Sequence, residues 1–270
     1  METRSRITIL LIVIAIFFNC QSENESPSFG KLIFEFGHQI NGVDVRYDQL
    51  IYENAAGNVY EITNIQWFMS DITLVNKNGN EFLLEGDDWI HYIDTDIPET
   101  QIWEIDQDIP TGEYVSIRFT FGIKGEKNIP NRFTDPPESN MLWPYHMGGD
   151  EGGYHYMKLN GFWRSLNLER TPFNFHIGVG QIYNDQGEVI EFVQNWFEKE
   201  IPSSSFSMPA EKTVRIAFKM NIENWFKNPH EYDHNQYGGK IMNNQEAMGK
   251  IKDNGIDVFS VVFLNDGENI

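Results

Sequence analysis

The chain has 270 residues, of which 40 are Asp or Glu and 20 are Lys or Arg, so its formal net charge is -20. This excess of carboxylates repels the phosphates of nucleic acids and of anionic lipid surfaces, so we expect no nucleic-acid partner and no basic membrane-binding face. Cys20 is the single cysteine. No disulfide within the chain can therefore hold the fold together, and we expect stability to come from a core or a ligand.

The first 28 residues have the features of an export and anchoring sequence. A basic start precedes an apolar block at 7–18, which is typical of a secretory signal peptide and too short to span a bilayer stably. Cys20 follows closely, so we predict a bacterial lipoprotein in which the signal peptide 1–19 is removed and Cys20 is lipidated. Residues 20–28 are predicted to be a flexible tether. We expect the mature protein outside the cytoplasm, lipid-anchored to an outer membrane or cell surface.

Residues 29–270 are predicted to form one domain, in which apolar and polar residues alternate. Between 113 and 123 the odd-numbered residues from Val115 onwards are apolar, whereas Ser116, Arg118 and Thr120 are polar. This period of two is typical of a half-buried strand. The pattern predicts an all-β fold, an antiparallel β-sandwich of about ten strands. The expected strands are 31–36, 58–76, 81–85, 89–93, 113–123, 154–160, 173–179, 188–193, 213–222 and 256–264.

Two long irregular segments and one helix interrupt the strands. The segments 124–153 and 223–242 contain Pro, Gly and Asn together with aromatic residues. Long irregular segments in a compact β domain are usually functional or disordered, and the aromatic content argues against disorder. The single expected helix covers 243–255, where an Asn start and an Asn-Gly end enclose helix-forming residues.

The end of the first irregular segment concentrates potential metal ligands. Residues 141–157 contain two histidines and three methionines. Imidazole suits copper, zinc and nickel, and a thioether favours copper(I). On a strand at 154–159, His155 and Met157 would share one face. His176 would lie on the polar side of the strand 173–179, from which it could join loop residues such as His146. A single His or Met in such a protein is usually a packing or surface group, so only the clustering favours a metal site.

A second cluster, 230-HEYDH-234, matches the H-E-x-x-H motif of zinc metalloproteases. On a helix, His230 and His234 would lie one turn apart, with Glu231 placed to activate a zinc-bound water. Pro229 before the motif and Gly238 after it leave fewer than ten residues for that helix. A zinc protease is therefore a minor alternative, and we expect the protein not to be an enzyme.

Six segments together resemble the MbnP-like copper-binding family, and especially its lipoprotein members from Bacteroidetes. In the family's order they are 58-NVYEITNIQWFMSDITLVNKNG-79, 90-IHYIDTD-96, 110-PTGEYVSIRFTFGI-123, 140-NMLWPYHMGGDEGGYHYMKLNGFW-163, 175-FHIG-178 and 241-IMNNQEAMGKIKDNGIDVF-259. They cover nearly the whole chain after the tether. The resemblance implies an extracytoplasmic β-sandwich that binds copper and acts in copper acquisition, storage or delivery rather than in catalysis.

The resemblance also implies which residues form the site. In characterised relatives, a Trp of a W-x-W motif is oxidised to kynurenine by a partner di-haem enzyme, and the modified residue helps to bind the metal. Trp143 matches the first Trp, whereas Tyr145 replaces the second. The family's His-Gly element matches 176-HIG-178 and makes His176 the first candidate ligand. The other candidate metal ligands are His155, His146, His38 and Met157, with Met141 as an alternative thioether.

A rival hypothesis comes from another class of protein. It is a surface-anchored module that binds a carbohydrate or a protein through stacking rings, while the histidines are structural. The stacking rings would be those of Tyr145, Tyr154, Tyr156, Trp143 and Trp163. The two hypotheses differ in geometry, because a metal site needs at least three His, Met or carboxylate groups within about 2–2.5 Å of one point. The module needs its aromatic rings exposed in a row.

Overall fold

The computed structural model describes residues 28–84, 89–201 and 204–264. The predicted signal peptide, the lipidation site Cys20 and the tether up to residue 27 lie outside these ranges. Within them, α3 is the longest helix, with 10 residues, and no helix there combines the length and the apolar character that crossing a bilayer requires.

Strands dominate the described chain, as the alternating pattern predicts. They are β1 (Phe29–Ile40), β2 (Val43–Asp44), β3 (Tyr52–Glu53), β4 (Val59–Asn76), β5 (Glu81–Leu83), β6 (Ile90–Asp94), β7 (Ile102–Pro110), β8 (Gly112–Phe121), β9 (Met157–Arg164), β10 (Arg170–Ile177), β11 (Val179–Tyr183), β12 (Val189–Gln194), β13 (Phe197–Ile201), β14 (Phe206–Met208), β15 (Thr213–Asn221) and β16 (Phe259–Leu264). The α-helices are α1 (Tyr145–Gly148), α2 (His234–Tyr237) and α3 (Gln245–Asn254).

Two large sheets form a β-sandwich, so the predicted fold class is confirmed. One sheet has the order β16-β15-β1-β2, and β7 pairs with β1 on the same edge as β2. The second has the order β10-β9-β4-β8-β13, with β3, β5 and β6 added along β4 and β14 added to β8. Every strand pair of the described chain is antiparallel except β1 and β15, which run in parallel from Lys31 opposite Thr213 to Gln39 opposite Asn221.

Aromatic rings fill the space between the two sheets. Phe36 of β1 stacks on Phe218 of β15, with ring centroids 5.8 Å apart. Phe218 meets Phe119 of β8, in the opposite sheet, edge to face at 5.6 Å. All three side chains are buried, and burying each stabilises the fold by roughly 1.5–3 kcal/mol. The core therefore lies where the alternating apolar faces of these strands meet.

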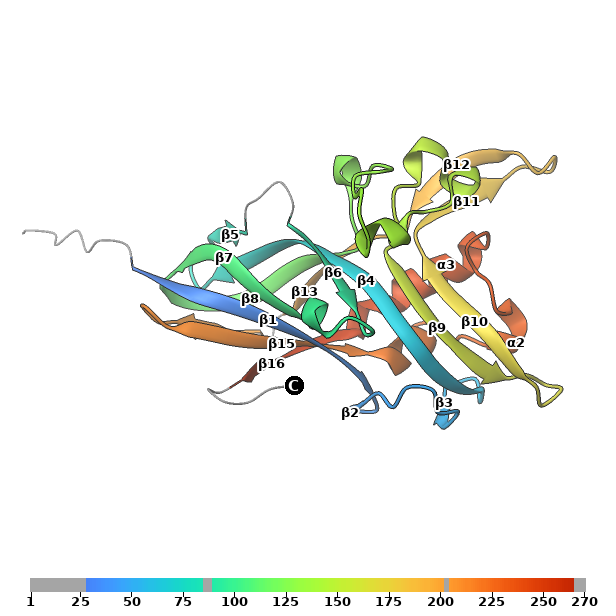
Figure 1. Ribbon diagram of the computed structural model, residues 1–270, viewed down its shortest axis with the longest axis horizontal. Helices are drawn as coiled ribbons and strands as arrows, with labels where there is room; N and C mark the ends of the chain where they lie inside the picture. Colours follow the sequence, from blue (N-terminus) through green and yellow to red (C-terminus); the bar gives the residue numbers. More distant parts are fainter. Residues whose placement is uncertain (1–27, 85–88, 202–203, 265–270) are drawn as a thin grey trace, which may run out of the picture.

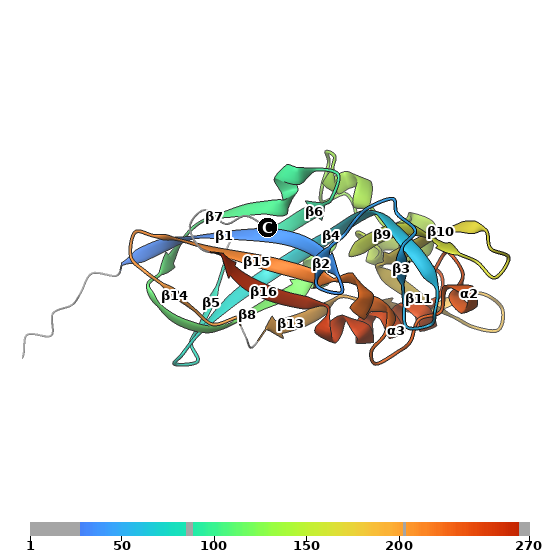
Figure 2. The same cartoon turned by 90° about the horizontal axis from the view of Figure 1, so that it is seen from below.

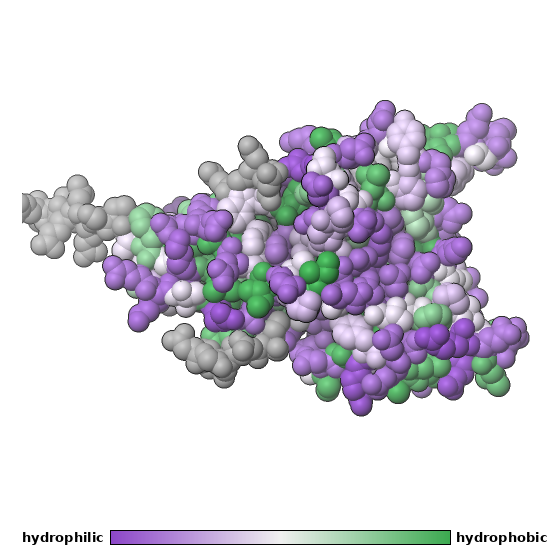
Figure 3. All heavy atoms as spheres, viewed as in Figure 1, coloured by the Kyte–Doolittle hydropathy of each residue, from purple (hydrophilic) through white to green (hydrophobic). Residues whose placement is uncertain are grey.

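The elements that matter for function gather at one end of the sandwich. Figure 1 shows β9, β10, the β11–β12 hairpin, α2 and α3 at the end opposite to the start of β1, and the turned view in Figure 2 agrees. β11 and β12 form a separate two-stranded sheet. Hydrophilic residues dominate the face in Figure 3, with hydrophobic residues in small groups between them, as the acidic composition leads us to expect.

Candidate metal centre

Trp143 is enclosed at this end of the sandwich and is 2% exposed. Its backbone N–H donates to the carbonyl of Gly153, 2.9 Å away. Three further glycines surround the indole: a Cβ at Gly148 would lie 2.6 Å from the indole Cδ1, one at Gly152 would lie 3.1 Å from it, and one at Gly178 would overlap the six-membered ring. The absence of these side chains makes the room for the indole.

Two histidines lie beside this tryptophan. The ring of His155 meets the indole of Trp143 at a centroid distance of 4.6 Å, and it meets the ring of His176 at 5.1 Å with an interplanar angle of 89°. His155 lies just before β9, and His176 belongs to β10, which pairs with β9. The structure thus brings these two candidate ligands side by side.

Hydrogen bonds fix which nitrogen of each ring carries a lone pair. Nδ1 of His155 lies 2.8 Å from the carbonyl of Met141, and a carbonyl only accepts, so Nδ1 carries the proton and Nε2 the lone pair. Nε2 of His176 donates to Oδ1 of Asn160 at 2.9 Å, which leaves the lone pair on Nδ1. That Nδ1 is buried and has no hydrogen-bond partner among the described residues. Each ring thus offers one nitrogen to a ligand.

The surroundings keep both rings neutral. Burial, and secondarily the charge of Lys158, lowers the pKa of His176 to about 3. Burial also lowers the pKa of His155 well below its usual range, aided by His176 and Lys158. Near neutral pH both imidazoles are therefore unprotonated, which is the form that binds a metal ion.

Met157 does not join this pair, so the predicted shared face of His155 and Met157 is wrong. β9 begins only at Met157, and the residues before it follow another path: Tyr154 forms a bridge with Leu142, and the N–H of Tyr156 donates to Ile177. Tyr156 and Met157 consequently both enter the main core. The alternation that the sequence predicts does not extend upstream of the strand.

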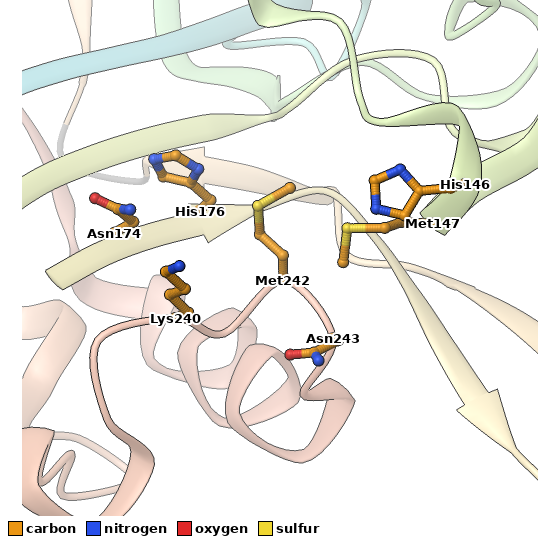
Figure 4. Close-up of a pocket in the computed structure, with 7 residues that line it drawn as sticks. All are labelled: His146, Met147, Asn174, His176, Lys240, Met242 and Asn243. Carbon is orange, nitrogen blue, oxygen red and sulfur yellow. The ribbon is translucent and has the colours of Figure 1, made fainter. Parts of the chain in front are cut away.

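His146 reaches the same region from another side. It lies on α1 and lines a pocket of about 460 Å³ together with His176 (Figure 4). The other residues that line this pocket are Met147, Asn174, Lys240, Met242 and Asn243. The structure therefore brings three of the predicted ligands, His146, His155 and His176, to one end of the sandwich.

Met242 is a lining residue that sequence reasoning does not identify. It reaches the pocket because the N–H of Asn174 donates to Gly239 at 2.7 Å and a bridge joins Asn174 to Lys240. These contacts link residues far apart in the chain, and nothing local to Met242 reveals them. Met147, in contrast, stands next to His146 in the predicted cluster and could have been identified there.

His38 lies elsewhere. It belongs to β1 and borders a different pocket with Asp44 and Lys219. The indole N–H of Trp67 donates to its Nε2 at 3.2 Å, so that lone pair is already used. His38 thus has a structural role in the described chain and does not contact the pair of His155 and His176.

The H-E-x-x-H motif does not have the geometry of a zinc protease. His230 lies in an irregular segment and pairs through Nε2 with Asp253 at 3.0 Å, whereas His234 is the first residue of α2. His234 is fully buried, and neither of its ring nitrogens has a hydrogen-bond partner among the described residues. The rings around it are those of Tyr60, Trp163, Phe173, Phe226 and Tyr232. The two histidines of the motif therefore do not lie on one helix, and the zinc-protease alternative loses its structural basis.

The rival stacking surface is likewise absent from the described chain. Of the five rings that it requires, Tyr145 is 68% exposed, whereas those of Tyr154, Tyr156, Trp143 and Trp163 are buried.

No group of three or more His, Cys, Asp or Glu residues converges as a metal site within the described ranges. A metal bound here would thus need donors other than these four types, such as the thioethers of the pocket.

The fold and this cluster define an all-β sandwich protein with a buried, neutral imidazole pair at one end. The family model MbnP matches residues 29–244, so the chain belongs to the MbnP family, as its resembling segments predict. The structure of MbnP from Methylosinus trichosporium is similar, with a TM-score of 0.51 and 13% identity, over 89% of this chain and 99% of that chain. At that identity the likeness concerns the fold. No curated protein matches this chain.

Proposed function

We propose that this protein is an extracytoplasmic, lipid-anchored copper-binding protein of copper acquisition, storage or delivery, and not an enzyme. The observation that carries the proposal is the unpartnered Nδ1 of His176 beside the neutral ring of His155. A buried nitrogen without a hydrogen bond costs about 1–3 kcal/mol, a cost that a bound metal ion would remove. Membership of the MbnP family supports copper as the metal.

Copper retention tests this proposal directly. We expect purified mature protein to hold about one copper ion per chain in equilibrium dialysis, by analogy with mononuclear sites built from histidines. The variants His155→Ala and His176→Ala should each lose most of the bound copper. His230→Ala is the matched control, since His230 pairs with Asp253 outside the cluster. Absence of copper from the wild type, or full retention by both site variants, would overturn the proposal.

The proposal includes two covalent changes. Cys20 carries the lipid anchor after removal of residues 1–19, and Trp143 is oxidised to kynurenine by a di-haem partner enzyme. Trp143 suits this role because its ring adjoins His155 and its Nε1 is buried with no hydrogen-bond partner among the described residues. Intact mass of protein from its native host is expected to show the lipid and an addition of about 4 Da at Trp143. An unmodified Trp143 would contradict the oxidation, and a free Cys20 would contradict the lipidation.

A further inference from the structure

Two methionines border the pocket from separate parts of the chain. Met147 lies on α1, and Met242 lies in the loop before α3. Figure 4 shows Met242 extending toward His176, with Met147 beside His146. The pocket thus presents two thioethers and two imidazoles.

Their exposure distinguishes these two methionines from the others. Of the eight methionines in the described ranges, six are at most 2% exposed and serve the core: Met69, Met141, Met157, Met208, Met220 and Met248. Met147 and Met242 are partly exposed and pack only against the edge of the core. Core packing accounts for the six, whereas the thioethers of Met147 and Met242 line an open pocket.

Hydrogen bonds fix the backbone of the two segments that carry these methionines. The N–H of Met147 donates to Pro144 at 2.9 Å. On the other side, the N–H of Asn244 donates to Ile241 at 2.8 Å, and the Asn244 side chain accepts from Ala247 at the start of α3. The loop that carries Met242 is thereby closed into a turn. Preorganised donors of this kind lose less entropy when they bind an ion.

The donor chemistry of the pocket is soft and neutral. Among the described residues no carboxylate lines it, although the chain carries 40 Asp and Glu residues, and Lys240 adds a positive charge at its edge. Calcium and magnesium require oxygen ligands, and the ammonium group of Lys240 repels a divalent ion about twice as strongly as a monovalent one. Thioether and imidazole donors without carboxylates select copper(I).

We propose that Met147 and Met242, together with His146 and His176, form a binding site for monovalent copper at the entrance to the buried imidazole pair. This inference rests on the proposed copper-binding function and adds two thioether ligands to it. His176 lines the pocket and also contacts His155, so it links the entrance to the buried pair. Copper(I) would enter through the thioethers.

Copper affinities in both oxidation states test the inference. The mature protein and its double variant Met147→Leu/Met242→Leu compete against a copper(I) chelator, bicinchoninate, under reducing anaerobic conditions, and against a fluorescent copper(II) chelator in air. We expect the double variant to lose copper(I) affinity by at least about tenfold and to keep its copper(II) affinity within about threefold. The control is Met208→Leu on β14, which Figure 2 places at the other end of the sandwich; its affinities should equal those of the wild type.

A second measurement needs no variant. In selenomethionine-labelled protein loaded with copper(I), X-ray absorption at the copper edge should show selenium in the first coordination shell. Wild-type protein that binds copper(I) without a copper–selenium contact, together with unchanged affinity in the double variant, would overturn the inference and leave the proposed function standing. Wild-type protein that binds neither oxidation state would overturn both.

Discussion

Trp143 shows how missing side chains prepare a site at the scale of single residues. The glycines around its indole come from the end of α1, from the turn that follows it, and from the junction between β10 and β11. A side chain at any of them would occupy space that the indole now fills. The position of the indole next to His155 therefore depends on glycines as much as on the tryptophan itself.

Gly178→Ala should push the indole out of place. The new Cβ would overlap the six-membered ring of Trp143, which is enclosed and has little room to move. Overpacking of this kind costs about 1–3 kcal/mol. We expect a lower denaturation midpoint in urea, with a change in the near-ultraviolet circular dichroism that reports on tryptophan environments.

Gly249→Ala is the matched control within the same protein. It lies inside α3, where the nearest atom to a new Cβ is Nε2 of Gln245, 3.9 Å away. Alanine is the better helix former by up to about 1 kcal/mol, so this variant should gain stability. Equal losses in the two variants would show that the room around Trp143 has no special role.

Sequence reasoning identifies the histidines of the site better than its methionines. His176 could be predicted because it stands among polar residues of an alternating strand, and His155 because it belongs to a dense local cluster. Met242 could not, because only the pairing of Asn174 with the segment at 239–240 brings it to the pocket. Local patterns reveal candidate ligands, and tertiary contacts decide which of them meet.

At the scale of elements, local signals succeed where an element needs no partner to define it. The helix predicted at 243–255 is α3, Gln245–Asn254, because Asn244 caps its start through a hydrogen bond from Ala247 at 3.0 Å. The strands predicted at 113–123 and 213–222 are β8 and β15 within two residues at each end. Alternation and capping are therefore sufficient to predict these three elements.

Sequence reasoning misses several strands, of which β7 is the longest, and misplaces the start of another. β7, Ile102–Pro110, pairs with β1 although three of its residues, Glu104, Asp106 and Asp108, are acidic. The three acidic residues face solvent and alternate with Trp103, Ile105 and Ile109. This alternation is present in the sequence and could have predicted the strand. β9 starts three residues later than predicted because tertiary bonds hold the residues before it. Those bonds have no local signature.

Buried histidines make the whole molecule sensitive to acid. Burial lowers the pKa of His38 to about 3, with Lys219 adding to the effect, and burial lowers those of His91 and His234 to about 4 and about 3. In the unfolded chain histidine titrates near 6.5. Between these values the unfolded state binds more protons than the native state, so stability must fall as pH falls through this window.

We expect the free energy of unfolding to decline from about pH 6.5 downward, by on the order of 1 kcal/mol per pH unit for each of these histidines. Urea denaturation at pH 7, 6 and 5 measures the slope above the range in which carboxylates titrate. His234→Phe removes one group that takes up a proton on unfolding, so the free energy of unfolding should depend less steeply on pH. A stability that stays flat between pH 7 and 5 would contradict this account.

The parallel pairing of β1 with β15 constrains how the molecule folds. Arg215 pairs with Glu35 across 180 residues of chain. The first strand to leave a ribosome or a translocation pore therefore has no neighbour on that side until nearly the whole polypeptide has followed, and contacts of such high sequence separation form slowly. During that interval β1 exposes an apolar face and unpaired backbone groups, which are hazards for aggregation. Folding of this protein is thus expected to be a late event, completed from the C-terminal end.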